Sequence, residues 1–173
     1  MNKITTLDSL VHLRPAWRAG GGTLVFTNGV FDLLHLGHVR YLQEARALGD
    51  ILVVGLNSDA SVRRLKGPRR PLVPQAERAE LLAALACVDH VVIYDTGTAE
   101  HLVAALQPEV YVKGGDYARP QAEDGAAANS SFPKPLPEAE VVRSYGGRVV
   151  LVPYLKDYST TELIDRILRN NRR

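Results

Sequence analysis

The sequence of 173 residues has few of the features that mark extracellular or membrane proteins. Its single cysteine, Cys87, excludes an internal disulfide bond and favours a reducing compartment. Cys87 lies in the apolar stretch LLAALACVDHVV, where a buried and inert thiol is expected. No apolar run approaches the roughly 18 residues of a membrane-spanning helix, and the first residues lack the apolar core of a signal peptide. We therefore expect a cytoplasmic protein without a membrane partner.

Charge of one sign is not in large excess, since the formal net charge is only +2. Bulk electrostatics therefore gives no argument for nucleic acid as a partner. Two basic segments, residues 63–70 and the terminal RNNRR, leave a nucleic-acid binder open as an alternative hypothesis. Such a binder should show a steep salt dependence, whereas the simpler interpretation is solvated surface charge.

Apolar strands and amphipathic helices alternate along the chain. Helices are predicted at residues 7–19 (bent or broken at Pro15), 38–49, 75–88, 98–107 (capped by Thr98) and 159–171 (capped by Ser159), and strands at 23–27, 51–56, 90–95, 109–115 and 148–154. Strands that are apolar throughout indicate a parallel sheet that is buried on both faces. We predict an α/β fold with a five-stranded parallel sheet between two layers of helices.

Three segments outside this alternation complete the expected organisation of one domain over residues 1–173. Residues 1–21 are expected to form an N-terminal helix and linker, and residues 63–74 a basic loop. Residues 118–137 are rich in Ala, Pro, Ser and Asn and lack apolar periodicity, which predicts a flexible insertion loop. This insertion is either a lid or a segment without function.

Polar residues follow four of the predicted strands. They occupy residues 27–38, 57–70, 113–117 and 158–161, and they include glycine, hydroxyl and basic side chains. Ligands of open α/β sheets bind at the carboxyl ends of the strands, near the point where the strand order reverses. We therefore expect these four stretches to meet at one site.

His35 and His38 flank Gly37 between a predicted strand and a predicted helix. A zinc site would need further ligands at fixed spacing, and the remaining histidines are isolated. A core role is disfavoured because polar groups at this position face the ligand edge. The third interpretation is an anion site, because Gly37 lets a ligand approach the free N–H groups at the positive end of the helix dipole. Two imidazoles there can donate hydrogen bonds to phosphate oxygens.

The stretch TNGVFDLLHLGH resembles the signature of the cytidylyltransferase-like nucleotidyltransferases, a G-x-F-D sequence followed by H-x-G-H. Three further stretches, VGLNSDASVRRLKGPRRPLVPQAERAELLAAL, YVKGGDY and YSTTELI, resemble the D-glycero-β-D-manno-heptose 1-phosphate adenylyltransferases of this superfamily. The likeness extends from about residue 22 to residue 168 and is interrupted by the longer stretch at 118–137. It implies a Rossmann-like doubly wound fold, ATP with Mg²⁺, a sugar 1-phosphate as acceptor, and a homodimer.

The resemblance also implies roles for individual residues. His35 and His38 would stabilise phosphate charge in the transition state, and Lys66 would close over the phosphates. Nucleotide binding is implied for Thr27, Asn28, Gly29 and Phe31 around the phosphates, for Lys113, Gly114 and Asp116 near the nucleoside, and for Ser159, Thr160 and Thr161 at the triphosphate. Phosphate or acceptor contacts are implied for Asp32, Arg64 and Arg78, and a metal receives no protein ligand. Without the resemblance, the basic residues are a solvated loop and Ser159 is only a helix cap.

The implied reaction converts ATP and a sugar 1-phosphate into an ADP-sugar and pyrophosphate. A phosphate monoester is already an anionic nucleophile, so a strong general base is not needed. Catalysis would come from positioning and charge stabilisation. The alternatives are the same chemistry on another acceptor (glycerol 3-phosphate with CTP, or FMN or phosphopantetheine with ATP) and a non-catalytic nucleotide-binding module.

Overall fold

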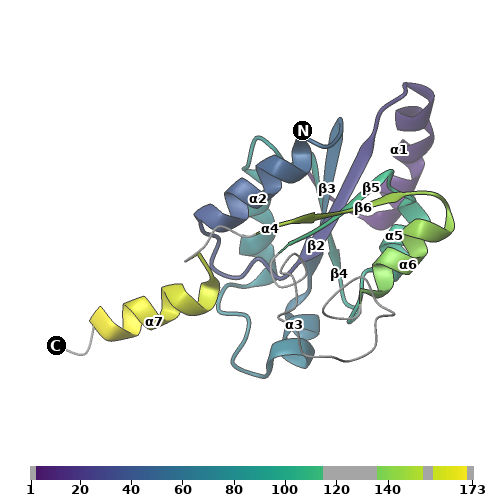
Figure 1. Cartoon of the computed structure of the whole chain (residues 1–173). Helices are drawn as coiled ribbons and strands as arrows, with labels where there is room; N and C mark the ends of the chain where they lie inside the picture. Colours follow the sequence, from purple (N-terminus) through teal and green to yellow (C-terminus); the bar gives the residue numbers. More distant parts are fainter. Residues whose placement is uncertain (1–2, 115–135, 154–157, 171–173) are drawn as a thin grey trace, which may run out of the picture.

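A parallel sheet of six strands forms the centre of the part of the chain that the structure, a computed structural model, describes: residues 3–114, 136–153 and 158–170 (Figure 1). The strands are β1 (Ile4–Thr5), β2 (Leu24–Gly29), β3 (Ile51–Asn57), β4 (His90–Tyr94), β5 (Val110–Gly114) and β6 (Arg148–Val152). The helices are α1 (Leu7–Ala19), α2 (Leu36–Arg46), α3 (Asp59–Lys66), α4 (Gln75–Ala83), α5 (Glu100–Leu106), α6 (Pro137–Ser144) and α7 (Thr160–Asn170).

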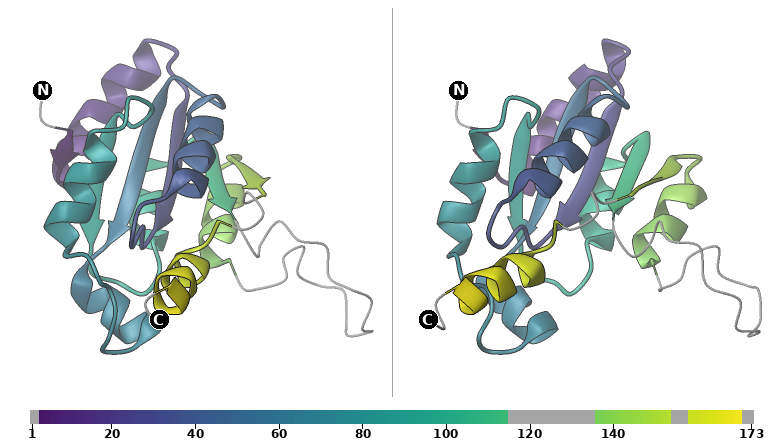
Figure 2. Two further views of the ribbon diagram at one scale, coloured as in Figure 1. Left: turned by 90° about the vertical axis from the view of Figure 1, so that its left-hand side faces the viewer. Right: turned by 60° about the vertical axis from the view of Figure 1, so that its left-hand side comes forward.

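The strand order is β1-β4-β3-β2-β5-β6, and each neighbouring pair is parallel. The chain leaves β2 toward β3 and β4, and later returns to the other side of β2 with β5 and β6. The order therefore reverses between β2 and β5, where ligands of such sheets bind. The arrowheads of the central strands point toward α3 and α7, so these two helices lie near the carboxyl edge (Figure 2).

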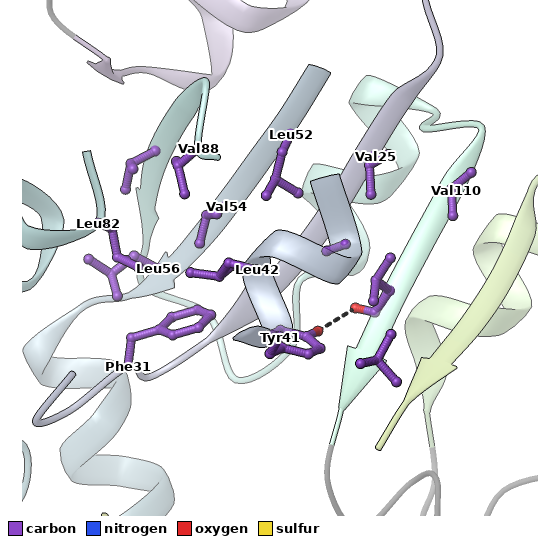
Figure 3. Close-up of a cluster of buried hydrophobic side chains, with 14 of the residues drawn as sticks. Val25, Phe31, Tyr41, Leu42, Leu52, Val54, Leu56, Leu82, Val88 and Val110 are labelled. Atoms are coloured by element: carbon purple, nitrogen blue, oxygen red, sulfur yellow. Dashed lines mark hydrogen bonds between the residues drawn. The ribbon is translucent and has the colours of Figure 1, made fainter. Parts of the chain in front are cut away.

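Two hydrophobic layers cover the sheet, one on each face. Side chains alternate along β2, so that Val25 packs on one face and Phe26 on the other. Helices α2 and α4 cover the first face, where Leu42 and Leu82 join the cluster drawn in Figure 3. Helices α1, α5 and α6 cover the second face. The predicted α/β fold with helices on both faces is confirmed.

The prediction of five strands was wrong, because β1 adds a sixth at the edge of the sheet. This strand has only two residues, Ile4 and Thr5, which pair with Val91 and Val92 of β4. Two residues are too few to show strand periodicity in a sequence, so the pairing depends on the tertiary contact with β4.

Helix α3 corrects the prediction that residues 63–74 form a loop, since residues 63–66 are its last turn. Ser58 caps the helix by accepting the Ser61 N–H at 3.0 Å. The backbone leaves the helix at Gly67, whose φ of 90° favours glycine. The many basic residues of this stretch made the short helix hard to predict from the sequence. The last turn of α3 places Lys66 over the carboxyl edge of the sheet.

Two expectations about helices need correction. Helix α1 does not break at Pro15, because buried Leu10 and Arg14 hold this part of the helix against the core. Ala99 rather than Thr98 is the N-cap of α5, and its N–H donates to Glu138 at 2.8 Å. The expected cap of α7 is confirmed, since Ser159 accepts the Glu162 N–H at 3.1 Å.

The predicted insertion at 118–137 lies outside the described residues as far as position 135. Its end was placed too late, because Pro137 is already the first residue of α6. None of the helices in the described ranges is long and apolar enough to cross a membrane.

Candidate active site

A cavity of about 120 Å³ lies at the carboxyl ends of β2 and β5, where the strand order reverses. The cavity is lined by Asn28, Gly29, Val30, Phe31, Asp32, His38, Tyr41, Lys66, Lys113, Gly114 and Thr160. All of these residues except Tyr41 come from the four separate stretches that were predicted to meet at this edge. The cavity is therefore the candidate site, and its walls are built by different elements.

The loop between β2 and α2 presents the two histidines. Phe31 and Leu33 have positive φ values of 48° and 51°, which turn the chain sharply into the helix. His35 is the N-cap of α2, and His38 lies in the first turn. Their rings stack with centroids 3.8 Å apart, and the Phe31 and His38 rings meet edge to face with centroids 5.3 Å apart. The two imidazoles therefore form one rigid unit at the helix start.

The proton of His38 is placed by a backbone contact. The His35 N–H donates to Nδ1 of His38 at 3.4 Å. A neutral imidazole that accepts at Nδ1 carries its proton on Nε2. Because His38 lines the cavity, the Nε2–H is the donor that it can offer to a ligand.

Burial lowers the pKa of His38 to about 3, and the positive charges of His35 and Lys66 act in the same direction. Asp32 opposes this shift only in part. The protein therefore holds His38 neutral at physiological pH. A neutral Nε2–H still donates a hydrogen bond to a phosphate oxygen.

His35 lies behind His38 rather than among the residues that line the cavity. Its Nδ1 is buried and has no hydrogen-bond partner in the part of the chain that the structure describes. Burial lowers the pKa of His35, and Glu162 partly opposes the shift. A Cβ at Gly37 would lie 3.0 Å from the His35 ring and from Tyr158, so glycine lets these groups pack together.

Lys66 reaches the cavity from the last turn of α3. Polar contacts anchor the start of this helix to the end of β4. Ser58 donates to the Asp95 carboxylate, and Ser61 donates to the Thr96 carbonyl at 2.8 Å. These contacts hold the start of α3 in place, and the Lys66 side chain at its end is exposed.

Asp32 organises the loop that follows α3. Its carboxylate accepts the N–H groups of Leu72 and Val73 at 3.0 Å and the Arg70 guanidinium at 2.9 Å. Burial alone would raise the pKa of Asp32, but these donors together hold that pKa below its ordinary value. Thr160 donates to the Asp32 carbonyl at 2.8 Å, which joins α7 to the same loop.

Arg78 lies beneath the cavity, with a relative exposure of 1%, rather than in it. It donates to the Val30 carbonyl at 2.6 Å, the Val73 carbonyl at 2.9 Å and the Asp59 carboxylate at 2.7 Å. These partners belong to the β2–α2 loop, the loop after α3, and α3 itself. The geometry therefore gives Arg78 a positioning role in place of the predicted phosphate contact.

The other residues that were predicted to belong to the site lie outside the cavity lining or outside the described residues. The Arg64 side chain is 55% exposed and pairs with Asp95, outside the cavity lining. Thr27 is buried below the cavity and contacts the Tyr41 hydroxyl at 2.6 Å. Ser159 and Thr161 flank Thr160 at the start of α7 without lining the cavity. Asp116 lies outside the described residues.

The wall formed by β2 and β5 contains a buried polar network. Lys113 donates to the Asn28 side-chain oxygen at 3.0 Å and to its carbonyl at 3.3 Å. The Tyr111 hydroxyl donates to the same side-chain oxygen at 2.7 Å, and the Asn28 amide donates to Tyr94 at 2.9 Å. The sequence did not single out either tyrosine. The alternation of β5 was the available signal, since Tyr111 and Lys113 lie two residues apart on one face.

Tyr41 was also missed, although it lies three residues after His38 on the same side of α2. Its hydroxyl donates to the Val112 carbonyl at 3.1 Å, the contact that Figure 3 marks, and so joins α2 to β5.

No cluster of three or more His, Cys, Asp or Glu residues that could hold a metal ion occurs in the described ranges. Asp32 is the one carboxylate among the described residues that line the cavity, and its oxygens accept the donors named above. The described side chains therefore do not offer a ligand set for a protein-held Mg²⁺.

Sequence comparison identifies the class of protein. Residues 26–166 match the family described as Cytidylyltransferase-like. This match includes the histidine pair, Lys66 and most of the sheet. The chain belongs to the cytidylyltransferase-like family.

The particular relatives are bifunctional proteins. The chain is 53% identical over 96% of its length to "Bifunctional protein HldE" of Geobacter metallireducens and 55% identical over 95% to that of Geotalea uraniireducens. It spans 31% of the length of each of these relatives.

Solved structures support the fold. The lipopolysaccharide core biosynthesis protein of Thermoplasma volcanium is 32% identical, with a TM-score of 0.56 over 80% of this chain and 100% of the other. Pantoate-beta-alanine ligase of Francisella tularensis, 12% identical, has the same TM-score of 0.56 over 98% of this chain and 80% of the other. The latter likeness concerns the fold alone.

Proposed function

We propose that the chain is an adenylyltransferase that transfers AMP from ATP to D-glycero-D-manno-heptose 1-phosphate, forming ADP-heptose and pyrophosphate for surface-glycan synthesis. The observation that carries this proposal is the stacked pair of His35 and His38, of which His38 lines the cavity together with Lys66. The names of the similar proteins, HldE and a lipopolysaccharide core biosynthesis protein, support the choice of acceptor.

The reaction is an in-line displacement at the α-phosphorus of ATP. An oxygen of the sugar phosphate forms the new bond to this phosphorus while the bond to the bridging oxygen breaks, and pyrophosphate leaves with the bonding electrons. The acceptor is already anionic, so its attack needs no proton transfer. Positioning and charge stabilisation then supply most of the catalysis.

Groups at the starts of α2 and α7 and at the end of α3 act on the phosphates. Neutral His38 donates its Nε2–H to a phosphate oxygen, and His35 fixes the orientation of the His38 ring through stacking and its backbone N–H. Lys66 closes from α3 and contributes a full positive charge. The free N–H groups at the start of α7, next to Thr160, bind the distal phosphates.

Mg²⁺ is part of the proposal as the ion that accompanies the triphosphate of ATP, and no step is assigned to it. We also propose a cytoplasmic location and a homodimer. Sedimentation analysis of the purified protein tests the dimer, and a monomer at micromolar concentration contradicts it.

The function is tested by a pyrophosphate-release screen of ATP, CTP, GTP and UTP against a panel of phosphate monoesters. The panel contains D-glycero-β-D-manno-heptose 1-phosphate, other sugar 1-phosphates, glycerol 3-phosphate, FMN and phosphopantetheine. We expect release with ATP and the heptose phosphate. Activity only with CTP and glycerol 3-phosphate contradicts the substrate assignment, and ATP binding without pyrophosphate release contradicts catalysis.

A further inference from the structure

Lys113 is the second lysine that lines the cavity, and the strands hold it in place. Its ammonium donates to two oxygens of Asn28, and the Tyr111 hydroxyl donates to one of these. The Asn28 amide is fixed in turn by Tyr94. Strands β2, β4 and β5 thus orient Asn28, and Asn28 orients the ammonium. Lys66, in contrast, is exposed at the end of a helix.

Lys113 and His38 approach the cavity from opposite faces of the sheet. Tyr111 packs in the cluster beneath α1, α5 and α6, and Lys113 shares its face because the two residues are two positions apart on β5. His38 belongs to α2, whose residues Tyr41 and Leu42 pack on the other face. The cavity therefore has Lys113 on one side of the sheet edge and His38 on the other, with Lys66 among the charges that act on His38.

The charged groups that act on His38 also differ from those that act on Lys113. The charges that act on the pKa of His38 are those of His35, Lys66 and Asp32. Burial lowers the pKa of Lys113, and the opposing charge is that of Glu138. A phosphate dianion bound beside Lys113 favours its charged form, because charge-assisted hydrogen bonds are strong where water is excluded. The two walls can hold separate anions.

An in-line displacement places the attacking oxygen and the leaving group on opposite sides of the phosphorus. With the departing pyrophosphate on the side of His38 and Lys66, the nucleophile enters from the side of β5. We propose that Lys113, oriented by Asn28 and Tyr111, binds the phosphate of the acceptor. The proposal rests on the proposed function, and it replaces the expectation that Lys113 lies near the nucleoside.

The test compares three variants with the same chemical change: Lys113→Met, Lys66→Met and Lys3→Met. Lys3 donates to the Leu85 carbonyl at the start of β1 and serves as the control for loss of a positive charge. Calorimetry measures the affinity for α,β-methylene ATP. It then measures the affinity for the acceptor with this analogue bound, and steady-state kinetics gives the KM of each substrate.

We expect Lys113→Met to weaken acceptor binding at least about tenfold, as loss of a charged hydrogen bond does, and to change analogue binding less than about twofold. Lys66→Met should show the reverse preference, and Lys3→Met should change neither affinity. Unchanged acceptor affinity in Lys113→Met overturns the inference. An equal or larger loss of analogue affinity also overturns it and returns Lys113 to the nucleotide.

The two proposals fail in different ways. If the wild-type protein uses glycerol 3-phosphate and Lys113→Met loses affinity for that compound, the heptose assignment is wrong and the role of Lys113 is supported. If the wild-type protein is active on heptose 1-phosphate and Lys113→Met has a normal acceptor KM, only the role of Lys113 is contradicted. Tyr111→Phe adds a milder variant that keeps the lysine and loosens its orientation.

Discussion

The two walls of the cavity are built by different means. The α2 wall consists of a loop and the starts or ends of helices, which Asp32 and Arg78 tie together through backbone carbonyls and N–H groups. The β5 wall consists of strand residues, in which Asn28 and Tyr111 connect neighbouring strands directly. The contacts of the first wall join loops and helix ends, whereas those of the second wall lie within the sheet.

This difference gives each wall a task in the proposed reaction. Charge develops on the leaving pyrophosphate, and His38 and Lys66 on that side can stabilise it. The acceptor must approach along one direction, and a lysine fixed by a buried network supplies that direction. The following changes test the contrast, from the largest expected effect to the smallest.

Replacement of Arg78 should break the connections of the α2 wall. Arg78→Met leaves the Asp59 carboxylate and the Val30 and Val73 carbonyls without their donor, and loss of one partner of a buried pair costs about 3–5 kcal/mol. Arg70→Met is the matched control, because its side chain is 25% exposed and Asp32 keeps two backbone donors. Urea denaturation measures both free energies of unfolding, and equal losses contradict the positioning role.

Removal of a histidine should lower turnover and leave the fold intact. His38→Ala should reduce kcat by about 10²–10³, the usual loss for one charge-stabilising donor, and His35→Ala should act in the same direction. Exposed His12 on α1 gives the control variant, His12→Ala, with unchanged turnover. Pyrophosphate release measures kcat, and circular dichroism checks the fold. Near-normal turnover in both site variants contradicts the assignment.

The lowered pKa of His38 predicts sensitivity of the fold to acid. The unfolded side chain binds a proton below about pH 6.5, whereas the folded one stays neutral until its pKa of about 3. Between these values the unfolded state binds more protons, so the free energy of unfolding falls as pH falls. The loss between pH 7 and pH 5 is about 2 kcal/mol at most.

Urea denaturation at these two pH values measures the loss in the wild type and in His38→Gln, which keeps a polar side chain. The variant should lose less stability on acidification. An identical loss in both proteins shows that His38 does not contribute.

The smallest effect is expected in the β5 wall. Tyr111→Phe removes one hydrogen bond to Asn28, worth about 1 kcal/mol, while Lys113 continues to donate to the same oxygen. Tyr145→Phe is the control, because its hydroxyl donates to the Pro108 carbonyl away from the cavity. Both variants should be similarly stable, but only Tyr111→Phe should raise the acceptor KM. Equal KM values contradict the link between the network and the acceptor.

The sequence predicted the α2 wall better than the β5 wall. His38, Asp32 and Lys66 lie in contiguous stretches with recognisable spacing, so their approximate place followed from the order of strands and helices. The network of Asn28 and Tyr111 depends on which strands become neighbours, and pairing between β2 and β5 joins residues 83 positions apart. No local pattern contains that information.

The same limit explains Arg78 and β1. A basic residue in a polar stretch predicts a solvent-facing or ligand-facing charge, and the burial of Arg78 depends in part on the carbonyl of Val30, which is 48 positions away. The pairing of β1 likewise depends on β4 rather than on its own two residues.

The neutral state of His38 also affects how the site treats competing anions. A further permanent cation beside Lys66 and Lys113 would attract any small phosphate in the surroundings and would slow its release. A neutral imidazole attracts such ions less, and its Nε2–H still donates to a ligand oxygen that lies in the right direction. His38 therefore adds directional selection to the site without adding charge.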